Sequence, residues 1–246
     1  DKWNLTEDAT WNETSVNYSL TVEQDDVSVD YYASNYSNIW RNGSDSQLLS
    51  TRVWDIDAQR FVSIGEAGGE IWITTDGVTY TSENSPSSDS YGYFNYTFNP
   101  TGCSYGLGKQ KWKMGTISNA CFKDYNTSEY NITLQSYLNT TVTYPSGQAF
   151  NQSSLVPVWV DVVDECNGGV AAVTPVLFFY GTGSTYTISS GITDVGNGTY
   201  NYSFDTAGRV LHWYNLTAQA DKSFYVQGND TVTDAFRIGK TPELSN

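Results

Sequence analysis

Basic residues are scarce in this chain. Its 246 residues include 12 Lys and Arg against 27 Asp and Glu, which gives a formal net charge of −15 and a sequence pI near 4.2. Nucleic-acid binding draws its affinity from basic side chains that displace counterions, so a surface of this charge repels phosphate backbones. We therefore expect no nucleic-acid partner.

Histidine is almost absent, since His212 is the single one. This excludes sites built from several imidazoles of one chain. A serine nucleophile would have to use His212, which lies in a strand-like run, and the sequence has no Gly-x-Ser-x-Gly elbow. We predict a structural or surface role for His212, no catalytic residue, and a protein that is not an enzyme.

Long apolar runs are missing too. The longest dense apolar patch, residues 176–180, is strand-sized, whereas a membrane helix needs about 20 apolar residues. We expect no membrane span in this chain. No signal peptide is present either, and a mature secreted chain would have lost it.

Cysteine is limited to Cys103, Cys121 and Cys166. Cys103 and Cys121 flank a short loop, and we predict that they are bridged; closing such a loop stabilises a fold by about 3 kcal/mol. Cys166 would then be free, buried, or paired between chains. No Cys-x-x-Cys spacing occurs, so a zinc site has no support.

Asparagine sequons, by contrast, are abundant. The pattern N-x-[ST] occurs 14 times, although 20 Asn and 55 Ser or Thr residues predict about 4 or 5 matches by chance. This excess predicts N-glycosylation, and hence an extracellular or cell-surface location. The predicted glycosylation sites are Asn4, Asn12, Asn17, Asn35, Asn42, Asn95, Asn126, Asn131, Asn139, Asn151, Asn197, Asn201, Asn215 and Asn229.

The chain also repeats itself at an offset of 106 residues. Residues 92–102 align with residues 198–208, and the sequons at Asn95 and Asn201 coincide. Further upstream, the same ungapped offset places Leu49 on Leu155 and Asp55 on Asp161. One constant offset over about 60 residues indicates two copies of one unit.

The repeated unit is predicted to be all-β. Residues 48–56, 70–75 and 94–98 are strand-like, as are their counterparts 156–163, 175–180 and 200–204, and no convincing helix is present. Short strands in units of about 100 residues favour β-sandwiches. We predict two tandem Ig-like β-sandwich domains, residues 46–138 and 139–246, after an N-terminal extended segment, residues 1–45.

That extended segment holds a strand-like stretch over residues 16–22, with apolar residues on one face. Such a strand needs a partner. It could be donated to the sheet of the next subunit, which would build a polymer. Pairing within its own first domain is the alternative, and is slightly favoured.

Residues 194–204, Asp-Val-Gly-Asn-Gly-Thr-Tyr-Asn-Tyr-Ser-Phe, resemble immunoglobulin-like repeats of prokaryotic surface proteins. Residues 98–112 and 119–126 are similar to a cysteine-containing insert in long archaeal surface proteins. The resemblance implies stacked Ig-like domains, Asn-linked glycans, and a role in surface layers, sheaths, filaments or adhesion. The second unit departs from it, because Arg209 stands where the offset would place Cys103.

Two further kinds of site are considered. Acidic residues near strand ends, namely Asp55, Asp57, Asp161 and Asp164, are weak Ca²⁺ candidates, because Ca²⁺ prefers oxygen ligands. Eight tryptophans suggest carbohydrate stacking. We place Trp54, Trp72, Trp159 and Trp213 in the core, which leaves Trp3, Trp11, Trp40 and Trp112 as binding candidates.

Together these features predict a non-enzymatic structural subunit of an extracellular assembly, such as a filament, sheath or surface layer. The alternative is an adhesin or carbohydrate-binding ectodomain. Covalent N-glycans are expected, Ca²⁺ is a candidate, and no other cofactor is. The expected partners are further copies of the chain, with other surface proteins or glycans as candidates.

Overall fold

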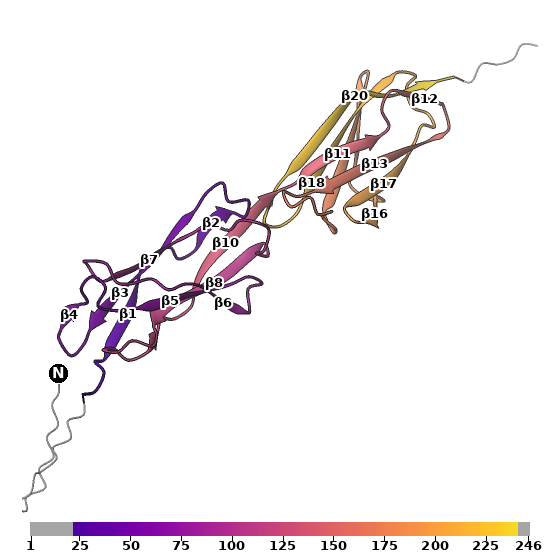
Figure 1. Cartoon of the computed structure of the whole chain (residues 1–246). Coiled ribbons are helices and arrows are strands. Elements are labelled where there is room, and N and C mark those ends of the chain that lie inside the picture. Colours follow the sequence, from indigo (N-terminus) through magenta and orange to yellow (C-terminus); the bar gives the residue numbers. More distant parts are fainter. Residues whose placement is uncertain (1–21, 241–246) are drawn as a thin grey trace, which may run out of the picture. The chain divides into compact units, whose positions relative to one another are not determined.

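The structure is a computed structural model that describes residues 22–240, in which every regular element is a β-strand (Figure 1). Among these residues no helix is long and apolar enough to cross a membrane. The strands follow the period-two alternation of the sequence. In the strand Tyr93–Phe98, for example, Phe94 and Phe98 are buried, whereas Asn95 and Thr97 are exposed.

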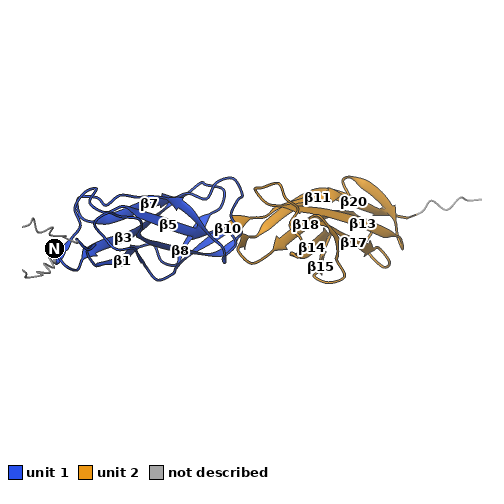
Figure 2. Ribbon diagram, turned by 60° about the horizontal axis from the view of Figure 1, so that its bottom comes forward, with its two compact units in different colours: residues 1–134 blue, residues 135–246 orange. Residues whose placement is uncertain are grey.

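The chain forms two compact units, residues 1–134 and 135–246 (Figure 2). The boundary falls four residues before the predicted one at 138/139, and it lies within the strand Tyr130–Tyr137. Each unit is a sandwich of two sheets with its own core. The predicted all-β class with two tandem Ig-like sandwiches is confirmed.

In unit 1, β3 lies at the centre of the first sheet, and β1, β7 and β4 all pair with it antiparallel. The second sheet has the order β10-β8-β5-β6, with β2 paired to β10 and β9 paired to β8. The strands are β1 (Val27–Ala33), β2 (Ser37–Trp40), β3 (Gln47–Asp55), β4 (Arg60–Phe61), β5 (Gly69–Thr74), β6 (Tyr80–Asn84), β7 (Tyr93–Phe98), β8 (Gly108–Thr116), β9 (Tyr125–Asn126) and β10 (Tyr130–Tyr137).

In unit 2, one sheet has the order β11-β13-β17-β16 and the other has the order β12-β20-β18-β14-β15. A short strand, β19, pairs in parallel with Ser136 and Tyr137 at the end of β10. The strands are β11 (Asn139–Tyr144), β12 (Gln148–Asn151), β13 (Leu155–Val163), β14 (Thr174–Gly181), β15 (Ser184–Ile188), β16 (Thr193–Gly196), β17 (Thr199–Asp205), β18 (Trp213–Asp221), β19 (Tyr225–Val226) and β20 (Gly228–Gly239).

Aromatic side chains dominate the core of unit 2. The rings of Phe179 and Phe204 stack with centroids 4.1 Å apart, and those of Tyr214 and Phe236 stack at 5.2 Å. All four side chains are almost completely buried. They come from both sheets, so their contacts join the two layers of the sandwich.

The hydrogen bonds at matching positions bear out the repeat but shift its register. The amide of Val53 donates to the carbonyl of Gly92 at 2.9 Å, and that of Val162 donates to Gly198 at 2.8 Å. Gly92 and Gly198 are 106 positions apart, as predicted, but Val53 and Val162 are 109 apart. The ungapped alignment of β3 with β13 is therefore wrong by three residues. Unit 1 has three more residues between Val53 and Gly92 than unit 2 has between Val162 and Gly198.

The repeat also begins earlier than predicted. β1 pairs with β3 as β11 pairs with β13, and β2 pairs with β10 as β12 pairs with β20. The described part of the supposed extended segment, residues 22–45, thus belongs to the first sandwich, and the boundary at 45/46 is wrong. The candidate donated strand, residues 16–22, lies outside the described residues except for Val22.

Candidate functional site

The sequon asparagines lie at the surface of both units. Among the eleven that the structure describes, none is buried. Seven are exposed and four are half-buried, so their side chains are accessible for modification. The exposed ones are Asn42, Asn95, Asn126, Asn139, Asn151, Asn197 and Asn229, and the half-buried ones are Asn35, Asn131, Asn201 and Asn215. Asn4, Asn12 and Asn17 lie outside the described residues.

Asn95 and Asn201 occupy matching places in matching strands. Asn95 lies in β7 opposite Ser50 of β3, and Asn201 lies in β17 opposite Trp159 of β13. Both side chains point out of the sandwich, as predicted. The Asn95 amide is engaged: Ser50 Oγ donates to its Oδ1 at 2.6 Å, and its Nδ2 donates to Asp89 at 3.1 Å.

Three tryptophans lie opposite to their predicted placement. Trp112, predicted to lie outside the strands, is in β8 and fully buried, with its indole N–H donating to the Ser34 carbonyl at 3.0 Å. Trp159 and Trp213, predicted to be core, are 37% and 36% exposed.

The remaining tryptophans complete this correction. Trp54 and Trp72, also predicted to be core, are half-buried, and so is Trp40, a predicted binding candidate that lies in β2. Trp3 and Trp11 are outside the described residues. The exposed Trp159 and Trp213 therefore lie on the outer faces of strands, in β13 and β18, and not in loops.

The cysteine prediction is wrong. Cys121 is a free, exposed thiol, whereas Cys103 and Cys166 are both disulfide-bonded. A bridge between Cys103 and Cys121 is thereby excluded in this structure. Loop length alone could not reveal this, because three cysteines allow three pairings and only the fold decides among them.

The four candidate Ca²⁺ ligands do not come together. Asp55 is buried and accepts from the Ala58 amide, Asp57 accepts from the Asp26 amide, and Asp161 accepts from the Thr199 hydroxyl. None of these three belongs to a group of acidic, cysteine or histidine ligands close enough to share an ion within the described chain.

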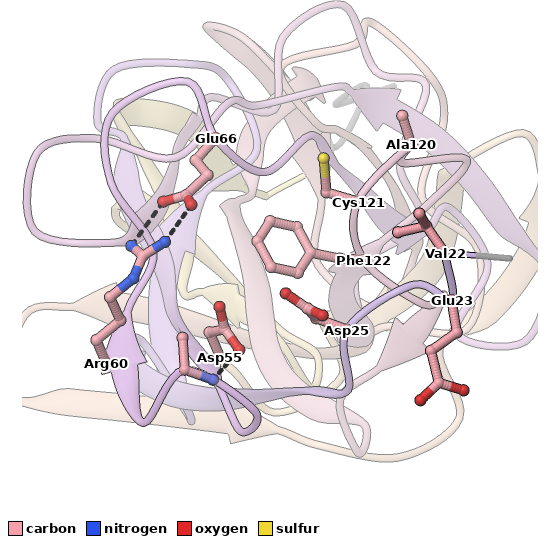
Figure 3. Close-up of a pocket in the computed structure, with 10 residues that line it drawn as sticks. Val22, Glu23, Asp25, Asp55, Arg60, Glu66, Ala120, Cys121 and Phe122 are labelled. Carbon is pink, nitrogen blue, oxygen red and sulfur yellow. Dashed lines mark hydrogen bonds and ion pairs between the residues drawn. The ribbon is translucent and has the colours of Figure 1, made fainter. Parts of the chain in front are cut away.

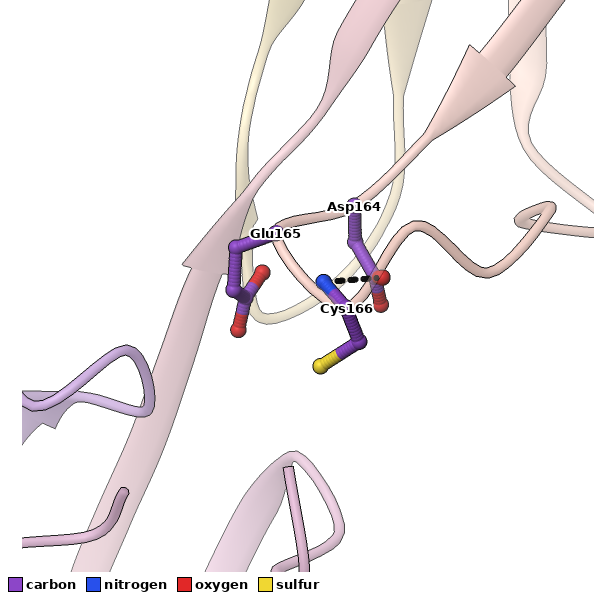
Figure 4. A group of neighbouring side chains, drawn as sticks. All are labelled: Asp164, Glu165 and Cys166. Carbon is purple, nitrogen blue, oxygen red and sulfur yellow. Dashed lines mark hydrogen bonds between the residues drawn. The ribbon is translucent and has the colours of Figure 1, made fainter. Parts of the chain in front are cut away.

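Asp164 does have such neighbours. It lies with Glu165 and Cys166 in the loop after β13, and the three offer ligand atoms within 4.8 Å of one another (Figure 4). Asp164 accepts from the Cys166 amide at 3.0 Å. The sulfur of Cys166 is disulfide-bonded, so it is not the thiolate that a metal requires. Two carboxylates of one loop remain, and they do not form a metal site on their own.

Unit 1 contains a pocket of about 470 Å³ that the sequence did not indicate (Figure 3). Its lining is mostly polar and acidic, with the free thiol of Cys121 at one side. The residues that line it are Val22, Glu23, Asp25, Asp55, Ala58, Arg60, Glu66, Ala120, Cys121 and Phe122.

One ion pair dominates this pocket. The guanidinium of Arg60 binds both carboxylate oxygens of Glu66, with Nη1 to Oε2 at 2.8 Å. These hydrogen bonds, together with one from the Ser63 amide, lower the pKa of Glu66 to about 2. Arg60 is the only basic residue that lines the pocket, and its charge is thus compensated by the carboxylate of Glu66.

His212 is exposed, in agreement with the predicted surface role. In the described part of the chain, His212 belongs to no group of three or more side chains that could share a metal ion.

No protein-family model matches this sequence, and no curated protein sequence matches it either. Solved structures do match. A titin fragment of three Ig domains, I67–I69 in an E-to-A variant, aligns with a TM-score of 0.50 at 5% identity, over 86% of this chain and 65% of that one. The I-band fragment I67–I69 aligns over the same shares with a TM-score of 0.49 at 4% identity.

An Escherichia coli adhesin, FdeC, aligns with a TM-score of 0.39 at 11% identity, over 90% of this chain and 68% of that one. The two alignments with a TM-score below 0.5 carry no argument, and at 5% identity the alignment with the E-to-A variant of titin I67–I69 bears on the fold alone. The titin fragment supports tandem Ig-like β-sandwiches, and none of these alignments carries an argument about function.

Proposed function

We propose that this chain is a non-enzymatic structural subunit of an extracellular cell-surface assembly, and that it is heavily N-glycosylated. The observation that carries the proposal is the placement of the sequons. All eleven described sequon asparagines avoid the cores, in a chain with about three times the number of sequons that chance predicts.

Glycans at these positions would suit an exposed β-protein. They would cover both sheets of each unit and lie beside open strands, where bulky hydrated groups hinder unwanted pairing. Asn95, Asn139 and Asn201, for instance, lie on strands whose outer faces are open to solvent. The archaeal type of surface protein, inferred from the resemblance, fits such a chain.

Self-association is the second part of the proposal. A subunit that binds the next copy through two different surfaces forms an open polymer. The strand-like residues 16–22 are the proposed donor. Just after them the chain is held in unit 1: the Asp25 amide donates to the Cys121 carbonyl at 2.7 Å, and the Lys123 amide donates to Asp25 at 3.0 Å.

Two measurements on native material test the proposal. Glycopeptide mass spectrometry should find most of the fourteen sequons occupied, and electron microscopy should show filaments or lattices. Deleting residues 1–21, which spares the contacts of Asp25, should leave a folded protein that no longer polymerises. Occupancy below about a third would reduce the sequon excess to a composition effect.

The alternative function, an adhesin or carbohydrate-binding ectodomain, is favoured by the outward tryptophans. Trp159 and Trp213 present open rings on the outer faces of two different sheets. A ligand site of that kind should give saturable binding to a glycan array, and Trp159→Thr or Trp213→Thr should abolish it. If the native protein is monomeric and binds glycans in this way, the adhesin or carbohydrate-binding function replaces the proposed assembly function.

A further inference from the structure

The sheet formed by β14, β18 and β20 carries aromatic rings on its outer face. Tyr180 of β14 is 40% exposed and Trp213 of β18 is 36% exposed. The ring of the half-buried Phe178 lies nearly parallel to that of Tyr180, at an angle of 15° with centroids 6.3 Å apart. We call these three side chains the aromatic cradle.

A sequon asparagine lies within the cradle. Asn215 of β18 pairs directly with Tyr180, and Phe178 pairs with Thr217, the hydroxyl residue of the same sequon. Trp213 precedes Asn215 by two residues, so it points to the same face of the sheet. Directly paired residues have Cβ atoms about 5 Å apart, and diagonal neighbours about 7–8 Å.

The side-chain oxygen of Asn215 is held by a backbone hydrogen bond. The backbone N–H of Asp234 donates to its Oδ1 at 2.8 Å, at an irregularity in the pairing of β18 with β20. This contact fixes the amide oxygen to the protein. The hydrogen bond does not involve the Nδ2 atom, which carries the sugar in an N-glycan.

We propose that the first sugar of an N-glycan on Asn215 packs against the aromatic cradle and forms part of the folded surface of unit 2. The inference rests on the proposed N-glycosylation. The apolar C–H face of a sugar ring suits the electron-rich face of an aromatic ring, and the packing removes exposed apolar surface from water.

The surroundings favour a saccharide as the occupant. Small hydroxyl side chains border the cradle: Thr185 is paired with Tyr180, and Thr187 with Phe178. They can accept and donate hydrogen bonds to sugar hydroxyls. A single sugar linked at the centre reaches the rings without the loss of translational freedom that a separate partner would incur.

The chain supplies a matched pair of variants. Thr217 and Thr231 are hydrogen-bonded to each other through their hydroxyls at 2.8 Å, and each completes a different sequon, that of Asn215 and that of Asn229. Asn229 is exposed and pairs with Gln219 instead of an aromatic residue. Thr217→Val and Thr231→Val therefore lose the same hydrogen bond and one glycan each, but only Thr217→Val loses the glycan in the cradle.

In the glycosylated full chain, Thr217→Val should lower the melting temperature by several degrees more than Thr231→Val does. In unglycosylated chain, the two variants should melt together. The double variant Tyr180→Thr/Trp213→Thr should abolish the difference in the glycosylated chain. In NMR spectra, ring currents should shift the C–H protons of the first Asn215-linked sugar upfield, and the same double variant should remove that shift.

Equal melting of the two glycosylated threonine variants, with Asn215 shown to be occupied by mass spectrometry, would overturn the inference and leave the proposed function intact. An unoccupied Asn215 would overturn it as well. The occupancy of the other sequons, measured in the same spectra, then decides separately whether the proposed N-glycosylation fails.

Discussion

At the scale of single residues, the thiol of Cys121 allows a direct chemical test of the structure. Cys121 is the free and exposed cysteine, whereas Cys103 and Cys166 are disulfide-bonded. Under native, non-reducing conditions a maleimide should therefore label one thiol per chain, at Cys121. Peptide mapping checks this. Labelling of Cys103 or Cys166 would contradict the structure, and the variant Cys121→Ser, which should not be labelled, is the control.

The ion pair of Arg60 and Glu66 gives a pH dependence. The hydrogen bonds from Arg60 lower the pKa of Glu66 from 4.5 to about 2, so the pair stabilises the fold above the unfolded pKa. That contribution is lost as the pH falls from about 4.5 towards 2. Glu66→Gln should be less stable than the wild type at neutral pH, and the difference in melting temperature should vanish near the lower value.

Arg60→Gln is the matched variant for this pair. It should give the same pH-dependent difference, and the double variant should add little to either single change. A difference between wild type and Glu66→Gln that persists unchanged at the lowest pH would rule out the ion pair as its source.

At the scale of strands, Gly198 allows the close backbone approach between the end of β13 and the start of β17. Gly198 has φ +79°, and its carbonyl accepts a hydrogen bond from the Val162 amide. A Cβ on Gly198 would lie 2.3 Å from the carbonyl oxygen of Val162. Gly183, with φ +69°, has nothing within 4 Å of such a Cβ. Gly183→Ala should cost about 1–2 kcal/mol through its backbone conformation alone.

Gly198→Ala should cost clearly more, because backbone atoms must also move. Urea denaturation of both variants measures the comparison. Equal losses would show that the close approach at Gly198 relaxes without cost.

Much of the strand pattern could be predicted from the sequence, since burial alternates with period two. In β13, the four valines at 156, 158, 160 and 162 point inward, so Trp159 must point outward. Trp159 was predicted to be core because it falls within a predicted strand, but a strand buries only every second side chain. In β8, the buried Trp112 and Met114 alternate with lysines. The strand was not predicted, because its sequence is rich in basic residues.

Other features leave no local signal. β1 and β2 share no recognisable sequence with β11 and β12, so only their pairing reveals the full repeat. The three-residue shift between β3 and β13 is invisible to an ungapped comparison. The pocket of unit 1 depends on long-range contacts, such as that of Asp25 with Cys121, which no spacing in the sequence predicts.

At the scale of the whole molecule, charge opposes the proposed self-association. Each copy carries a formal charge of −15, so two copies repel each other at low ionic strength. The screening length falls from about 30 Å at 0.01 M salt to about 8 Å at 0.15 M. Polymerisation should therefore speed up as salt is added over this range, and light scattering measures its rate.

A neutral osmolyte at matched osmolality is the control, and it should not reproduce the acceleration. Assembly that slows with salt would instead indicate that oppositely charged surfaces hold the copies together.

The equivalence of β7 and β17 also has a consequence for how the chain finds its fold. Two strands with almost the same sequence pattern could pair with β3 during folding. They are β7, Tyr-Phe-Asn-Tyr-Thr-Phe, and β17, Thr-Tyr-Asn-Tyr-Ser-Phe, about a hundred residues apart. Exchange of equivalent strands is a characteristic misfolding route of tandem repeats. Pairing of β3 with β7 is favoured because these strands are closer in the chain. It is also favoured by the outer-face partners, since Asn95 accepts from the Ser50 hydroxyl whereas Asn201 lies opposite Trp159. The different partners of Asn95 and Asn201 thus favour the pairing of each strand within its own sandwich.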